Sequence, residues 1–240
     1  MIKKVKLIDI FDCQEESSFY SYCLEMLVLN RCDNSEIIVE FGSGDGMPVI
    51  NAVRRTKFGG MIEGYEINGA ACDIAFSNIE KYALDDIYII HKSCLFKNIP
   101  RIGRKYLVSN PPYLPARNNN IRLPFIYGGK NGSEITKQLI ELGFDNILVI
   151  ISSYSDPEGI ISYALLRDYH VSDFIISPIK FGYYSSESAV RERIEELRQN
   201  NMAFYSENIY LLAGTLFKRR CESANNLSSE LIRVMKSLRN

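Results

Sequence analysis

The sequence lacks the side-chain clusters that a structural metal site needs. Its 240 residues contain two histidines and six cysteines, and no two cysteines form a Cys-x-x-Cys pair. A zinc site requires about four such ligands at close and regular spacing. We therefore expect no metal site, and we expect reduced thiols in a cytoplasmic protein.

Long apolar runs are also missing. Although 46% of the residues are hydrophobic, no run approaches the roughly 20 residues that cross a bilayer. The first four residues, Met-Ile-Lys-Lys, lead into alternating and then acidic residues, which is not the pattern of a signal peptide. We therefore expect a soluble cytoplasmic protein with no membrane partner.

An excess of charge of one sign is absent as well. The net charge is −1 and the sequence pI is about 6.2. A chain of this balance has no general basic field to gather nucleic acid, although a local basic patch is compatible with it.

Strand-like apolar runs alternate with helical periodicity along the chain, and no internal repeat interrupts them. We predict strands over 36–41, 59–67, 87–92, 105–110, 146–152, 171–177 and 208–218, and helices over 17–31, 47–55, 69–84, 133–143, 158–169 and 186–200. Alternation of this kind implies right-handed crossovers and a mostly parallel sheet covered on both faces. The predicted fold class is a single doubly wound α/β domain of seven strands, with an antiparallel pair at one edge.

The domain boundaries follow from the same pattern. We predict a short helical extension over residues 1–35, the α/β domain over 36–220 and a helical tail over 221–240.

A glycine-rich turn, "EFGSGDG" (40–46), stands where the first strand passes into a helix. Glycines there permit a tight turn and let the backbone approach a ligand, and the helix N-terminus offers free N–H groups. No Gly-Lys-Ser/Thr follows, so the turn is not a Walker A loop. Its last glycine also comes one residue too early for the dinucleotide fingerprint.

Glu66 ends the second predicted strand about 20 residues after this turn, where an acid can accept hydrogen bonds from both hydroxyls of a ribose. Taken alone, the glycines could form an ordinary tight turn and Glu66 could be a solvated carboxylate. Together, at this spacing, they favour a nucleoside ligand.

The strongest signal is Asn110-Pro111-Pro112-Tyr113, which follows the fourth predicted strand. The Asn110 side-chain oxygen and the Pro111 carbonyl can both accept hydrogen bonds from one planar NH₂ group. The prolines fix these acceptors before a substrate arrives, and the Tyr113 ring offers a face for stacking. A proline-stiffened loop with a buried tyrosine is the alternative interpretation.

These residues resemble a known family, the class I S-adenosylmethionine (SAM)-dependent methyltransferases that carry an Asn-Pro-Pro-Tyr motif. The resemblance covers about residues 36–220. Within that group the chain is most similar to the release-factor glutamine methyltransferases, because "NPPYLP" is followed by "YGGKNGSEI" (127–135). Adenine N6-methyltransferases share the tetrapeptide.

The resemblance implies SAM as the cofactor and direct transfer of its methyl group to a planar nitrogen. It implies that Asn110, Pro111, Pro112 and Tyr113 form the catalytic segment. It also implies a set of cofactor-binding residues: Glu40, Phe41, Gly42, Ser43, Gly44 and Gly46 beside methionine and ribose, Glu66 on the ribose diol, Ile67 against adenine, and Cys94, Leu95 and Asn110.

Two features depart from the family pattern. Cys94 stands where the family usually has an acid that contacts the adenine amine, and a thiol is a poorer acceptor than a carboxylate. Adenine recognition must then rely on backbone groups. The extension before the glycine turn is also shorter than the helical domain of many release-factor enzymes.

The substrate stays open among several classes. A Gln or Asn amide in a protein or peptide is the first candidate, because it fits the near-neutral charge and residues 127–135. An adenine amine in DNA or RNA is the second; basic residues near the tetrapeptide could serve it, namely Arg101, Arg104, Lys105, Arg117 and Arg122. A small metabolite is the third, with residues 180–187 as a lid. A SAM-binding protein without turnover is the alternative from another class, and the oligomeric state stays open.

Overall fold

The computed structural model describes residues 10–99, 105–219 and 225–238. The chain divides into two compact units, the first ending at Ser109 and the second beginning at Asn110. The boundary predicted at residues 220 and 221 lies outside the described residues. None of the helices in the described ranges is long and apolar enough to cross a membrane.

The first unit is built on four parallel strands in the order β3-β2-β1-β4. Their bounds are Ile37–Phe41 (β1), Met61–Glu66 (β2), Tyr88–Lys92 (β3) and Tyr106–Ser109 (β4). The chain moves from β1 outward to β3 and then returns to the other side of β1. This reversal puts a topological switch point at the carboxyl ends of β1 and β4, where open α/β sheets bind ligands.

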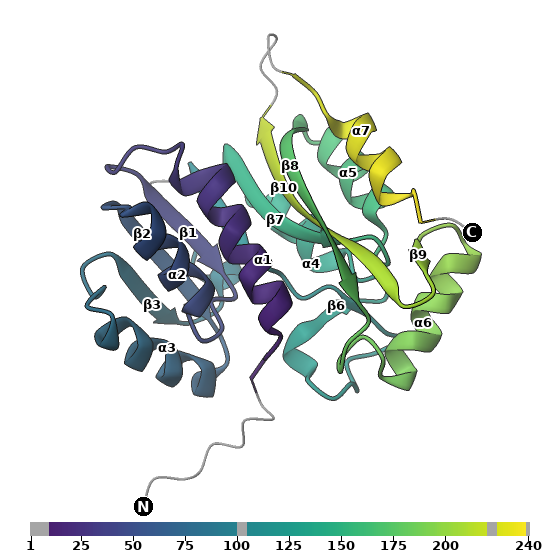
Figure 1. Cartoon of the computed structure of the whole chain (residues 1–240), viewed down its shortest axis with the longest axis horizontal. Coiled ribbons are helices and arrows are strands. Elements are labelled where there is room, and N and C mark those ends of the chain that lie inside the picture. The colour runs from purple at the N-terminus through teal and green to yellow at the C-terminus, as the bar shows by residue number, and fades with distance from the viewer. Residues whose placement is uncertain (1–9, 100–104, 220–224, 239–240) are drawn as a thin grey trace, which may run out of the picture. The chain divides into compact units, whose positions relative to one another are not determined.

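Helices connect these strands as the periodicity predicts. The helices are α1 (Gln14–Leu24), α2 (Met47–Thr56) and α3 (Gly69–Lys81), with a π-helical turn, η2 (Glu25–Leu29), and a 3₁₀ turn, η3 (Leu95–Lys97). Figure 1 shows α1 beside α2, where the Ser21 hydroxyl donates to the Pro48 carbonyl at 2.6 Å. The predicted helix at 17–31 thus corresponds to α1 and η2, which begin and end a few residues earlier.

The second unit carries the antiparallel strands. Strand β10 (Ile209–Arg219) pairs antiparallel with β7 (Asn146–Ser152), with the long β8 (Tyr169–Lys180) and with the short β9 (Tyr205–Ser206). Its helices are α4 (Glu134–Glu141), α5 (Pro157–Leu165), α6 (Ser188–Gln199) and α7 (Ser228–Met235). Parallel strands in the first unit and antiparallel ones in the second confirm the predicted fold class.

A small parallel pair also belongs to the second unit, and the sequence pattern did not predict it. Strand β5 (Leu114–Pro115) pairs with β6 (Tyr127–Gly129), and a 3₁₀ turn, η4 (Pro124–Ile126), precedes β6. Two- and three-residue strands are too short to show a period, which is why the pattern missed them.

Candidate functional site

The glycine loop, residues Gly42–Gly46, has a backbone that only glycines adopt easily. Gly42, Gly44 and Gly46 have φ values of 73°, 57° and 75°, in the left-handed region that strains other residues. A side chain added at Gly42 or Gly44 would meet no described atom within 4 Å. The loop backbone therefore faces open space, and its glycines leave it bare for a ligand.

Glu66 holds this loop from the end of β2. Its Oε2 accepts a hydrogen bond from the Gly44 N–H at 2.9 Å, and its Oε1 accepts one from the Asn68 N–H at 2.7 Å. The side chain is 8% exposed. Each carboxylate oxygen can accept two hydrogen bonds, so both oxygens still have a lone pair for a ligand hydroxyl.

Glu40 lies in β1, just before the glycine loop, and is more deeply buried than Glu66. Its side chain is 1% exposed, and it accepts hydrogen bonds from the hydroxyls of Tyr20, at 3.1 Å, and Tyr88. Burial raises the pKa of Glu40 to about 7, because removal from water disfavours the charged form. No sequence motif marks the two tyrosines, since they come from α1 and β3, far from the glycine motif.

The remaining predicted cofactor residues differ in their exposure. Ile67 is 59% exposed and Leu95 is buried, whereas Cys94 is half-buried just before η3. The Phe41 and Phe96 rings lie 5.2 Å apart. Ile67 therefore offers an apolar surface to a ligand, but the Leu95 side chain belongs to the core.

The tetrapeptide Asn110–Tyr113, which we call the ledge, opens the second unit. Oδ1 of Asn110 is buried, and within the described part of the chain no hydrogen-bond partner reaches it. Pro111 and Tyr113 are buried as well. A buried amide oxygen without a partner is expensive, so Asn110 carries an acceptor that a ligand N–H could satisfy.

The ledge follows Ser109 directly in the chain. The Ser109 hydroxyl donates to the carbonyl of Phe41 at 2.8 Å, which joins the ends of β4 and β1 inside the first unit. The structure brings Glu40, Glu66 and the glycine loop together at this edge. It places Asn110 one residue further along the chain.

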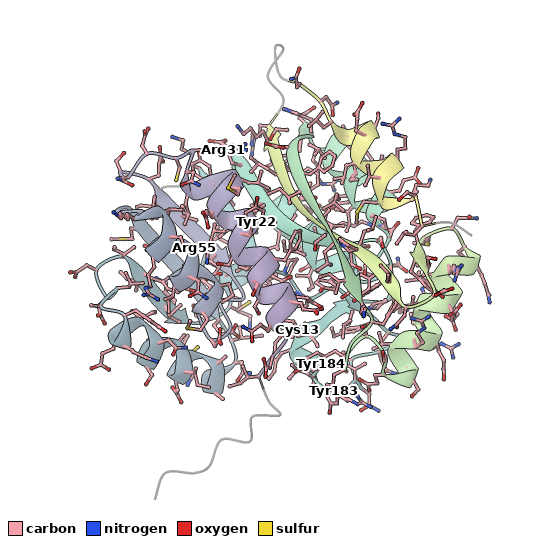
Figure 2. The ribbon with its side chains drawn as sticks, viewed as in Figure 1. Cys13, Tyr22, Arg31, Arg55, Tyr183 and Tyr184 are labelled. Carbon is pink, nitrogen blue, oxygen red and sulfur yellow. The ribbon has the colours of Figure 1, made fainter. Side chains whose placement is uncertain are left out.

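The tyrosines of the predicted lid, residues 180–187, lie at the surface of the second unit. Tyr183 is 66% exposed, and its ring contacts the Tyr184 ring with centroids 5.2 Å apart (Figure 2). The guanidinium of Arg122 stacks on the Tyr183 ring at 4.5 Å. Of the other basic residues named from the sequence, Arg117 pairs with Glu196 and Lys105 with Glu36, and Arg101 and Arg104 lie outside the described residues.

Other side chains that could have formed a site do not cluster. The described residues contain no group of three His, Cys, Asp or Glu that could hold a metal ion. His91 lies against Tyr65 with the two rings tilted and their centroids 4.8 Å apart. Its buried Nε2 has no hydrogen-bond partner among the described residues, so the expectation of a strand histidine with both nitrogens satisfied is not met. The charged helix α6 forms surface ion pairs such as Arg193–Glu196.

The sequence of the chain is similar to a methyltransferase over part of its length. No protein-family model matches the chain. It is 27% identical over 112 residues to a release factor glutamine methyltransferase of Gloeobacter violaceus, an alignment that covers 43% of this chain and 39% of that relative. The chain thus spans less than half the length of this curated relative.

Solved structures match over most of the chain. A Pyrococcus horikoshii protein assigned as an RNA methyltransferase superposes with a TM-score of 0.56 at 13% identity, over 91% of this chain and 92% of that one. The geranyl diphosphate C-methyltransferase of Streptomyces coelicolor, solved with S-adenosyl-L-homocysteine, superposes with a TM-score of 0.52 at 12% identity. The match covers 85% of this chain and 81% of that one. The chain therefore has the Rossmann-like fold of the class I methyltransferases.

Proposed function

We propose that this chain is a SAM-dependent N-methyltransferase acting on a planar amide or amine nitrogen, with the side-chain amide of Gln or Asn in a protein or peptide as the first candidate. The observation that carries the proposal is the buried Oδ1 of Asn110, which lacks a partner among the described residues. The similarity to a release factor glutamine methyltransferase supports the amide substrate.

The residues of the first unit fit SAM. The open space beside Gly42 and Gly44 admits a ligand against the backbone, and Glu66 has spare lone pairs for a ribose diol. The exposed Ile67 suits a flat adenine. Because Cys94 stands at the position of the usual acid, backbone groups must recognise the adenine amine.

When bound, SAM would supply a methyl carbon on a positively charged sulfur: a nitrogen lone pair can form a bond to that carbon while the carbon–sulfur bond breaks, S-adenosylhomocysteine leaves, and the nitrogen loses one proton. The chain contributes the binding and orientation of that nitrogen. Oδ1 of Asn110 and the carbonyl oxygen of Pro111 would each accept one N–H bond of an NH₂ group, which fixes its plane and turns its lone pair outward. The proline rings fix both acceptors in advance, so little ordering remains when the substrate binds.

An adenine amine in single-stranded nucleic acid is the second candidate, and one observation favours it. Residues 110–133 contain Arg117, Arg122 and Lys130 but no Asp or Glu. With Arg122 stacked on the exposed ring of Tyr183, this surface combines positive charge with an aromatic face, as single-strand binding requires. Arg117 is paired with Glu196, which leaves less charge for phosphates.

Labelling with tritiated SAM tests the proposal directly. The purified protein is incubated with labelled SAM and a lysate of the source organism, and the products are separated into protein, nucleic acid and small molecules. We expect label in the protein fraction that excess unlabelled S-adenosylhomocysteine suppresses. Label in the nucleic acid establishes the second candidate, and SAM binding without label in any fraction contradicts turnover.

Salt dependence of substrate binding separates the two candidates. Contacts to phosphates release counterions, so the affinity for a nucleic acid falls steeply with salt concentration. An uncharged amide has no such dependence. A flat profile for the labelled substrate between low and physiological salt supports the amide.

A further inference from the structure

Two of the four residues of the ledge cannot donate a backbone hydrogen bond. Pro111 and Pro112 have no backbone N–H, so neither can donate to a neighbouring strand. The prolines fix their own φ angles, but they do not fix where the segment lies in the fold. The two prolines must therefore be held through their carbonyl oxygens and by close packing.

One anchor is the glycine-rich segment Tyr127–Gly132. A side chain at Gly128 would place its Cβ 2.5 Å from the Cα of Tyr113 and 2.7 Å from the carbonyl oxygen of Pro112. Only glycine allows this approach, so backbone packs directly on backbone. The pairing of β5 with β6 continues the contact, with the Ala116 N–H donating to the Gly129 carbonyl at 3.2 Å.

The second anchor is Ser155, in the turn between β7 and α5. Its buried hydroxyl donates to the carbonyl oxygen of Tyr113 at 2.7 Å. Gly132, with φ 77°, encloses the same carbonyl, because a Cβ there would lie 2.3 Å from the Tyr113 oxygen and 2.8 Å from the Ser155 Oγ. The Ser155 hydroxyl thus reaches this carbonyl in a space that admits no side chain at residue 132.

Asp156 fixes the position of Ser155. It adopts a left-handed φ of 52°, which is rare outside glycine. Its carboxylate accepts hydrogen bonds from the Lys137 ammonium at 2.9 Å and from the Gly159 N–H at 3.1 Å. Its own N–H donates to the Met202 carbonyl at 3.0 Å. These bonds tie the turn to α4 and α5.

We infer that Ser155 is a positioning residue of the methyl transfer: by holding the Tyr113 carbonyl, it fixes the ledge in the orientation in which Asn110 and Pro111 receive the target nitrogen. This role rests on the proposed function. Displacement of a reacting group by about 1 Å slows catalysis by about a hundredfold, so loss of this anchor acts on turnover more than on cofactor binding.

The test compares Ser155→Ala with Ser153→Ala, in the full chain with labelled SAM and the substrate found by labelling. Ser153 is a matched control, since its buried hydroxyl donates to the Phe204 carbonyl at 2.6 Å and accepts from the Leu211 N–H at 3.0 Å, and neither partner belongs to the ledge. We expect kcat of Ser155→Ala to fall ten- to a hundredfold, with the Kd for SAM within twofold of wild type. Ser153→Ala should keep kcat within twofold at an equal or larger loss of Tm.

Amide hydrogen exchange gives a readout that does not depend on turnover. Exchange in peptides covering residues 113–120 should rise in Ser155→Ala and stay unchanged in Ser153→Ala. Unchanged exchange in Ser155→Ala, or kcat that falls in both variants in step with Tm, overturns the positioning role. A wild-type protein that methylates while Ser155→Ala keeps full kcat contradicts this role alone, whereas a wild-type protein that labels nothing contradicts the proposed function and this role with it.

Discussion

At the scale of single residues, two carboxylates on neighbouring strands have different environments. Glu66 accepts two backbone N–H bonds at the edge of the sheet. Glu40 is buried between two tyrosine hydroxyls, and burial raises its pKa to about 7. Glu66 is therefore suited to bind neutral hydroxyls beside the glycine loop. Glu40 is suited to a buried structural role at the end of β1, where the loop begins.

Replacing Glu66 with Ala should weaken SAM binding by roughly 1–3 kcal/mol, the usual range for losing a charged hydrogen-bond acceptor. The change removes the ribose acceptor and releases the Gly44 N–H. Isothermal titration measures the effect. Glu63→Ala on the same strand is the control and should bind SAM as wild type does, while equal affinities for all three proteins would refute the ribose assignment.

Glu40 should make stability depend on pH. The folded protein keeps a proton on Glu40 up to a pKa of about 7, whereas an unfolded chain loses it near 4.5. Its contribution to the free energy of unfolding therefore declines as pH rises from about 4.5 to about 7 and is level above, because the unfolded state binds fewer protons in that window. The decline should reach about 3 kcal/mol.

Urea unfolding of wild type and Glu40→Gln at pH 5, 6, 7 and 8 measures this contribution. Glutamine keeps an acceptor for the tyrosines but does not titrate, so the difference between the two proteins isolates Glu40. Between pH 5 and pH 7 the free energy of unfolding of wild type should fall relative to that of Glu40→Gln. A difference that is the same at all four pH values would show that Glu40 is ionised throughout.

At the scale of elements, two short strands set the path of the chain after the ledge. The pairing of β5 with β6 is parallel, and the glycines of β6 and the turn after it let the backbones approach closely. The rigid ledge thus packs against the glycine-rich segment Tyr127–Gly132. The support combines this close backbone packing with the hydrogen bond from the Ala116 N–H to the Gly129 carbonyl.

Gly128→Ala should therefore destabilise the protein and lower turnover. Its Cβ would lie 2.5 Å from the Cα of Tyr113, so backbone must shift, and overpacking of this kind costs about 1–3 kcal/mol. Gly182→Ala is the matched control, because a Cβ there meets no described atom within 4 Å. Thermal unfolding of both variants checks the expectation, and equal Tm values for them would show that residue 128 tolerates a side chain.

At the scale of the whole molecule, the alternation of strand-like and helical segments in the sequence predicted the fold class correctly. The buried strands β1 and β7 were predicted to within one residue of their observed ends, because a continuous apolar run bounded by turn residues is a strong signal. Strand β8 extends beyond its predicted 171–177 to Tyr169–Lys180, since its half-buried centre shows no such run.

Contacts between distant residues could not be predicted in this way. Helical spacing predicted a helix over residues 17–31, but nothing in it indicates that Tyr20 reaches Glu40. The motif drew attention to Asn110, but Ser155 carries no motif and is found only from its bond to Tyr113. Local patterns report burial and turns, whereas the partners of a side chain depend on the tertiary path of the chain.

The central claim is that Asn110 acts chiefly on the target nitrogen, so that its loss affects methyl transfer far more than the SAM binding in which it was also expected to take part. Single-turnover methylation and calorimetric SAM affinity, measured together on wild type and Asn110→Ala, test it most directly. The account predicts that methyl transfer falls below about one hundredth of the wild-type rate, as for loss of a preorganised polar group, while the Kd for SAM stays within twofold. Methyl transfer at the wild-type rate in Asn110→Ala would contradict it.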